Sequence, residues 1–388
     1  MADHIPFVTS LQTLKLVRST YADSTVLRIP LESAEKLHPL PSSSKVWIDG
    51  GVDGLHDLSS RSQDSAWYKL MRTIPGFEKL ATPGFIAKPE PSVVQWFVSA
   101  ILDKCAMSNP RWITVPQLPI VNDSLRNRVN RELAKATGQW KSASGFSGRL
   151  IYPLLFTHAE QTKGKTQRKP KVQHAGRCYH ESYADGFWVV DTSLMEESGS
   201  VALRNKRFKS TIELHQELNE VISSKIRIAG PYWGMNLVLW SRGLIDFPAI
   251  GVGGTYQYYL PGGHSHTASA RVAIGPLRRR VGVSDLTTWL ARTIKIIGAS
   301  HPAYSEIEKV QKQLSLLRDP DTSRIQVASF YRKWFDSLSS TPTVGRSLAL
   351  FQDLSQAFAL GRSLPDFTKE GAARKAESVV EPLMVNCL

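Results

Sequence analysis

The sequence contains few cysteines and no pattern typical of a metal site. Its three cysteines, Cys105, Cys178 and Cys387, are far apart in a chain of 388 residues, and no CxxC motif or cysteine–histidine ligand spacing occurs. This distribution is typical of reduced thiols and argues against a structural zinc site. His264 and His266 in the segment GHSH have no acidic or cysteine partner nearby. We therefore expect no bound metal and no other cofactor.

Long apolar runs and the familiar catalytic motifs are also absent. No run approaches the roughly 20 apolar residues that span a bilayer, and the initial MADHIPF carries no signal-peptide core. Walker A, GxGxxG, HExxH and GxSxG patterns do not occur. Their absence removes the usual NTPase, dinucleotide-binding, metalloprotease and serine-hydrolase interpretations. We expect a soluble, cytosolic protein with no membrane partner.

Acidic residues are outnumbered, and the formal net charge is +14. This balance favours polyanions, chiefly nucleic acid, as partners, although a basic surface can also serve solubility alone. Three basic clusters are predicted to bind phosphates, and the first two would lie on one rim of the fold because each follows a predicted strand. The clusters are Lys163, Lys165, Arg168, Lys169 and Lys171; Arg204, Lys206, Arg207 and Lys209; and Arg278, Arg279 and Arg280.

The most informative pattern that is present is a strand-like apolar run that recurs, each time followed by a helical stretch. Most of these runs are continuously apolar, which is typical of strands buried on both faces of a parallel sheet. Eight such strands with helices between them in about 250 residues predict a (β/α)₈ barrel, or TIM barrel. The predicted strands are 26–30, 45–51, 84–89, 111–120, 149–156, 186–191, 225–233 and 247–254.

Helices are predicted between these strands and throughout the C-terminal part of the chain. Segments 62–80, 91–107 and 122–137 have helical spacing of apolar residues or helix-capping residues. Segment 161–173 is polar and basic with almost nothing to bury, so we expect a mobile loop there. The predicted organisation is a barrel over 1–300, a helical C-terminal region over 301–368 and a frayed tail over 369–388.

Two aspartates, Asp49 and Asp191, end predicted strands. Barrel chemistry lies at the C-terminal ends of the strands, and a buried carboxylate there is costly unless it is hydrogen-bonded or functional. We predict that the two aspartates share a pocket, one as nucleophile or stabiliser of a cationic sugar centre and the other transferring a proton. The alternative is that each caps the following helix or turn. Asp53 and Asp57 lie close to Asp49 in sequence, so Asp49 is not unique as a carboxylate at this strand end.

Other polar and aromatic residues also follow predicted strands. Gln117 lies between two prolines, where its amide would read the edge of a base or sugar or simply form part of the loop. His158 is the histidine that we predict for acid–base work, and both residues would orient the substrate. Further glycines and aromatics predict a pocket for phosphate and stacked bases, with core packing of the aromatics as the alternative. These are Gly251, Gly253, Gly254, Tyr256, Tyr258, Tyr232 and Trp233.

The order of these features resembles the tRNA-guanine transglycosylase superfamily, including its relatives that insert deazaguanines into DNA. Asp49-Gly50-Gly51 is similar to the family's aspartate followed by Ser-Gly-Gly, and Asp191 is similar to its second strand-end aspartate. The resemblance covers roughly residues 45 to 260, and this chain lacks the family's zinc site of three cysteines and a histidine and the serine of its motif. It implies a (β/α)₈ barrel whose aspartates drive base exchange in nucleic acid.

The first hypothesis is therefore a nucleic-acid-directed barrel enzyme that acts at a base or its glycosidic bond, in the manner of a transglycosylase, on DNA or RNA. The second is a non-catalytic barrel that binds nucleic acid or a protein partner within a larger assembly, such as a bacterial antiviral defence complex. A third is a barrel enzyme for a small phosphorylated metabolite. That enzyme would need one phosphate site rather than several basic loops.

Overall fold

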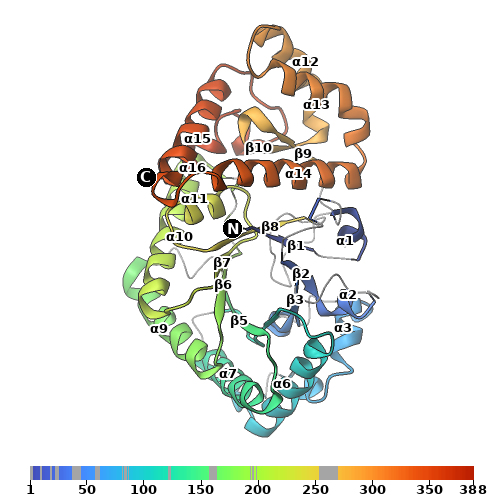
Figure 1. The fold of residues 1–388 in the computed structure, drawn as a ribbon, viewed down its shortest axis with the longest axis vertical. Coiled ribbons are helices and arrows are strands. Elements are labelled where there is room, and N and C mark those ends of the chain that lie inside the picture. The colour runs from blue at the N-terminus through green and yellow to red at the C-terminus, as the bar shows by residue number, and fades with distance from the viewer. Residues whose placement is uncertain are drawn as a thin grey trace.

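A computed structural model shows a closed barrel of eight parallel strands, which confirms the predicted (β/α)₈ architecture (Figure 1). The residues described are 3–8, 11–17, 20–21, 26–36, 45–56, 62–80, 82, 85, 87–120, 124–156, 164–192, 194, 196–197, 199–252 and 270–388. The barrel strands are β1 Ile5–Phe7, β2 Leu27–Pro30, β3 Val46–Asp49, β4 Trp112–Thr114, β5 Arg149–Phe156, β6 Gly186–Asp191, β7 Arg227–Ala229 and β8 Phe247–Gly251. A separate antiparallel hairpin consists of β9 Arg271–Ile274 and β10 Arg279–Gly282.

Strands β2 to β8 fall within predicted segments, whereas the prediction at 84–89 was wrong. Phe85 and residues 87–89, the part of that segment that the structure describes, belong to no strand. The strand that completes the barrel is β1, which pairs with β8 from Ile5 opposite Ala249 to Phe7 opposite Gly251. It was not predicted because it is three residues long and contains a proline, which strands usually avoid.

Helices surround the barrel and extend beyond it (Figure 1). Helix α6 confirms the prediction at 91–107, and α7 begins within the predicted segment 122–137 but continues to Ser144. The predicted helix at 62–80 is broken into two short helices, and residues 164–173, expected to form a loop, begin α9. The helices of the barrel are α1 Leu11–Val17, α2 Leu31–Ala34, α3 Ala66–Met71, α4 Phe77–Leu80, α6 Pro91–Ala106, α7 Ser124–Ser144, α9 Gly164–Glu181, α10 Val201–Val221 and α11 Met235–Ser241.

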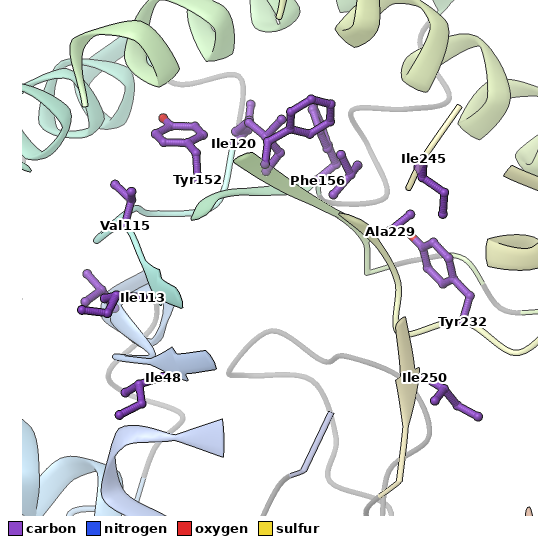
Figure 2. Packing of buried hydrophobic residues seen from close by; sticks show 14 of the residues in the cluster. Ile48, Ile113, Val115, Ile120, Tyr152, Phe156, Ala229, Tyr232, Ile245 and Ile250 are labelled. Atoms are coloured by element: carbon purple, nitrogen blue, oxygen red, sulfur yellow. The ribbon is translucent and has the colours of Figure 1, made fainter. Parts of the chain in front are cut away.

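The largest apolar core lies between the strands and the helices outside them. Side chains alternate between the two faces of a strand, and Ile48, Ile113, Tyr152 and Phe156 point outward into this core (Figure 2). The alternate residues point into the barrel and form a second apolar layer, in which aliphatic side chains surround four aromatic rings. Trp47 is its centre, with ring centroids 5.3 Å from Phe7, 6.0 Å from Trp112 and 5.5 Å from Trp188. The barrel interior is thus filled by large rings rather than by a channel.

The C-terminal helices form the expected extension. They are α12 Val283–Ile297, α13 Tyr304–Leu317, α14 Pro320–Ser339, α15 Arg346–Arg362 and α16 Val380–Val385. Three of them, α14, α15 and α16, also pack against the barrel. A separate apolar cluster runs from Val272 to Ala376. However, the apolar side of α14 belongs to the core of the barrel, where the Tyr21 hydroxyl donates to the carbonyl of Ala328 and the His4 ring packs 4.9 Å from that of Phe335.

The end of the chain is folded rather than frayed. Helix α16 packs against α10 and α15, and Leu383 and Cys387 are buried. The boundaries predicted at 300 and 368 remain predictions. Among the described helices, none is both long enough and apolar enough to span a membrane.

Candidate functional site

Asp49 lies inside the barrel at the C-terminal end of β3. It has the same strand parity as Trp47, and its side chain is 2% exposed. One carboxylate oxygen, Oδ2, accepts a charged hydrogen bond from the guanidinium of Arg28 on β2, and Oδ1 accepts from the backbone N–H of Gly51 at 2.9 Å. Gly51 has a φ of 64°, a left-handed conformation that glycine adopts readily. Asp49 therefore holds the following turn and also places a charge pair in the barrel.

Aromatic rings surround the Arg28–Asp49 pair. The Arg28 guanidinium lies 5.1 Å from the ring centroid of Phe7 and 5.6 Å from that of Trp188, so it makes cation–π contacts within the barrel. Two charges taken out of water are tolerated only when they are paired and hydrogen-bonded. Arg28 and Asp49 therefore each supply the opposite charge that the other needs in order to be buried.

A narrow cavity opens beside this pair, with an empty volume of about 220 Å³ and room for about one water molecule. It lies at the C-terminal ends of β3 to β6, the position at which (β/α)₈ barrels carry their active sites. Its polar lining residues are Asp49, Asp53, Thr114 and Gln117, and Trp188 forms part of its wall. Two of these, Asp49 and Gln117, were predicted to lie at the site.

Gln117 is the unusual residue of the cavity. The residue is 2% exposed, and neither Oε1 nor Nε2 has a hydrogen-bond partner among the described residues. Most buried amides in proteins are hydrogen-bonded, because an unpaired one loses its bonds to water without replacement. The amide thus offers one donor and one acceptor that the described part of the protein itself does not use.

Asp191 does not join Asp49 in this cavity. On β6 the inward residues are Trp188 and Val190, so the side chain of Asp191 follows the outward parity. Its backbone N–H donates to the Tyr232 hydroxyl at 2.5 Å, and Tyr232 belongs to the outer core. Burial, followed by the charge of Asp191, raises the pKa of Tyr232 well above its usual value. The second carboxyl at the cavity is instead Asp53, in the 3₁₀ turn Val52–His56.

The first two basic clusters lie largely on helices rather than on loops. In the first cluster, Arg168 is 2% exposed and pairs with Glu217 at 2.7 Å and Glu213 at 3.1 Å. Lys171 is buried as well, whereas Lys169 is exposed. Lys163 and the side chain of Lys165 lie outside the described residues.

In the second cluster, Arg204 is fully buried and donates to the carbonyl of Glu196 at 3.0 Å. Arg207 is buried too, and Lys206 and Lys209 are exposed. Phosphate binding by the exposed members of both clusters remains a prediction. The buried arginines are held by the protein itself because a buried charge needs partners.

The third cluster connects the β9–β10 hairpin to its surroundings. Arg278 binds both carboxylate oxygens of Asp353, at 2.5 and 2.8 Å. Arg279 is fully buried and donates to three backbone carbonyls between Ala373 and Ala376. Arg280 pairs with Glu197 at 2.8 Å. All three guanidiniums therefore have partners within the chain.

The predicted phosphate and base pocket is described only in part. Tyr232 and Trp233 are buried, and Trp233 stacks on Phe330 with ring centroids 5.9 Å apart. Gly251 ends β8. His158, Gly253, Gly254, Tyr256 and Tyr258, together with His264 and His266, lie outside the described residues. In the described part of the chain, no group of three or more metal-binding side chains occurs.

Sequence reasoning missed Arg28 and Thr114. Thr114 ends β4, and its hydroxyl accepts from the Trp47 indole at 2.9 Å. Arg28 interrupts the apolar run VLRIP, and a charge in a buried strand requires an opposite charge nearby. That signal was available, but it did not indicate which carboxylate would be the partner.

Comparison with known proteins identifies no family for this chain. No protein-family model matches the chain, and no curated protein matches it. The resemblance to the transglycosylases therefore rests on the quoted motifs and on the barrel architecture alone.

Proposed function

We propose that this chain is a barrel enzyme that acts on nucleic acid at a base or at its glycosidic bond. The observation that carries the proposal is the buried amide of Gln117, which has no hydrogen-bond partner in the described part of the chain and lies beside two carboxylates at the C-terminal end of the barrel. A protein gains nothing in stability from such an amide, so a ligand is the natural partner for it. An amide donates from Nε2 and accepts at Oε1, the pattern that complements the edge of a nucleobase.

The two carboxylates suit breakage of a glycosidic bond. Asp49, fixed by Arg28 and Gly51, would stabilise the positive charge that develops on the sugar as the bond to the base nitrogen breaks. Asp53 would take a proton from the attacking water and return it to the departing base. Water then adds to the anomeric carbon and the free base leaves. In base exchange, an incoming base would take the place of water.

Release of free bases from nucleic acid tests this proposal. The protein is incubated with mixed-sequence DNA and RNA, single-stranded and duplex, and released bases and abasic sites are measured by mass spectrometry. Asp49→Asn and Asp53→Asn should each lower the rate by at least ~100-fold, the usual contribution of a positioned acid or base. Asp64→Asn is the matched control, because Asp64 is 95% exposed and lies away from the cavity lining. Equal activity in all three variants would remove the carboxylates from the chemistry.

One observation favours a second function, a non-catalytic binding module. Both oxygens of Asp49 already accept hydrogen bonds, and the cavity has room for little more than a water molecule. In that case no base would be released from any substrate in the pool, whereas a nucleic acid or a protein partner would still bind. The same experiment, combined with a binding measurement, separates the two functions.

A further inference from the structure

The outer helices α7 and α9 carry an unusual share of the positive charge. Together they contain ten lysines and arginines and only two acidic residues, Glu132 and Glu181. The two helices pack side by side on the outside of the barrel (Figure 1). More than half of the net charge of +14 is therefore concentrated on one pair of helices.

Part of this charge serves the fold. Arg168 joins α9 to α10 through its two glutamates. Lys141 donates to the carbonyls of Phe146 and Gly148 at 3.0 and 2.7 Å and so holds the chain after α7. Arg131 pairs with Glu181 at 3.0 Å and links α7 to α9, yet its side chain remains 52% exposed.

The other cations form two exposed stripes. Arg128, Arg131 and Lys135 follow one another at three- and four-residue spacing, so they share one face of α7. On α9 the exposed cations are Lys169 and Arg177. Among the described residues, Arg128, Lys169 and Arg177 have no carboxylate partner.

The two stripes lie close enough to act on the same groups. Burial is the main reason that the pKa of His174 is lowered, and the next causes are the charges of Arg177 on its own helix and Arg131 on α7. The contact between Arg131 and Glu181 independently joins the two helices at this point. Arg131 and Arg177 therefore bring the two stripes together at this point.

An exposed aromatic ring lies at the end of this face. Tyr183 follows α9, is 63% exposed and has a φ of 51°, a conformation that few non-glycine residues adopt. Its ring lies over Gly138 of α7, where a Cβ atom would come within 3.1 Å of the ring and 2.3 Å of the carbonyl of Glu181. Lys135 lies one turn before Gly138 on α7. The absence of a side chain at Gly138 thus permits Tyr183 to lie beside the basic stripe.

We infer that this face, defined by Arg128, Arg131, Lys135, Lys169, Arg177 and Tyr183 and called the α7–α9 face, binds single-stranded nucleic acid. Cations that follow a phosphate backbone, together with an exposed ring on which a base stacks, are the features by which proteins hold single strands. A duplex would use the cations but not the ring. An anionic membrane requires several apolar side chains beside the cations. The exposed residues Gln139, Ser142, Gln173 and His180 on these helices are polar, and Leu125, one turn before Arg128, is 37% exposed.

This inference differs from the one drawn from the sequence, which placed the phosphates at the mouth of the barrel. It also stands apart from the proposed chemistry, since the face lies on the outside of the barrel and contains none of the residues of the cavity. A binding module and an enzyme would use it equally.

The test is binding of a fluorescent single-stranded oligonucleotide of about 15 nucleotides, which lies within the usual range of site sizes. Binding of oligo-dT and oligo-U is measured by anisotropy over a series of salt concentrations. The triple variant Arg128→Gln, Lys169→Gln, Arg177→Gln should lower the log–log salt slope by roughly 2 and weaken binding on the order of 100-fold at 0.1 M salt. Lys295→Gln, Lys309→Gln, Lys333→Gln is the control, because it removes the same charge from exposed positions on α12, α13 and α14.

Tyr183→Asn tests the ring without straining the fold, since asparagine tolerates a positive φ. It should weaken binding of the single strand roughly 5- to 100-fold and leave binding of a duplex unchanged. Equal losses in the triple variant and its control would overturn the inference, because any positive charge would then serve. An unaltered affinity in Tyr183→Asn, together with equal affinity for a duplex, would overturn the assignment to single strands. No binding by the unaltered protein would overturn both.

Discussion

Replacing Gln117 by methionine should make the protein more stable. Methionine is unbranched and similar in size to glutamine, so it fills the same space without the two polar atoms that lack partners among the described residues. Each buried donor or acceptor left unpaired costs ~1–3 kcal/mol. The cavity has room for about one water molecule, and such a water would satisfy one of the two atoms. The other atom remains, so Gln117→Met should raise the free energy of unfolding by about 1–2 kcal/mol.

Urea unfolding measures this change, with the fluorescence of the tryptophans inside the barrel as the signal. Gln313→Met is the matched control, because Gln313 is exposed on α13 and the same substitution there should change stability by less than about 0.5 kcal/mol. Gln117→Met should at the same time lose base release, since the methionine cannot donate or accept. A variant that is less stable than the unaltered protein by about 1 kcal/mol or more would refute the reasoning. The amide would then be bonded in the native protein and would serve the fold rather than a ligand.

Two further predictions concern buried ionisable groups. Arg28→Met leaves Asp49 buried without its cation and should lower the free energy of unfolding in urea by about 3–5 kcal/mol. The double variant Arg28→Met, Asp49→Leu should recover most of this loss. A loss of less than about 1 kcal/mol in the single variant would contradict the importance of the pair. Burial, followed by the charge of Arg332, lowers the pKa of His4 to about 3, so the folded protein keeps this ring neutral while the unfolded chain takes up a proton below pH 6.5. The free energy of unfolding should therefore fall by about 1.4 kcal/mol per pH unit as the pH drops from 6.5 towards 3. In His4→Phe, whose ring suits the aromatic surroundings, the free energy of unfolding should fall less over the same pH range. Parallel pH curves for the two proteins would rule out His4 as a cause.

The barrel could be predicted because its strands are buried on both faces and read as continuous apolar runs. Segment 84–89 was mistaken for a strand because a short apolar run has no period that distinguishes strand from helix. The total of eight strands was nevertheless right, since this extra strand compensated for the missing β1. Local sequence could not identify β1, because most of its pairing is with β8, more than 200 residues away, whereas only Phe7 pairs with the nearby β2.

A residue of the candidate site could be predicted only where its position at the end of a strand was enough to place its side chain at the cavity. Asp49 ends β3, Gln117 follows β4, and both line the cavity. Asp191 also ends a strand, but a difference of one residue in parity turns its side chain to the other face. The arginines show a similar limit, because Arg204 and Arg279 appear as charges in the sequence and only the tertiary structure reveals that they are buried.

The position of α14 against the N-terminal segment around the first strand has a consequence for synthesis of the protein. Tyr21 and Ala328, which share a hydrogen bond, are separated by 307 residues. During translation the first strand leaves the ribosome long before either its neighbour β8 or the helix that covers it has been made. For most of its synthesis the growing chain therefore exposes the apolar surface that β8 and α14 later cover. The barrel can close only when the chain is nearly complete. We therefore expect nascent chains of this protein to expose this apolar surface until late in synthesis.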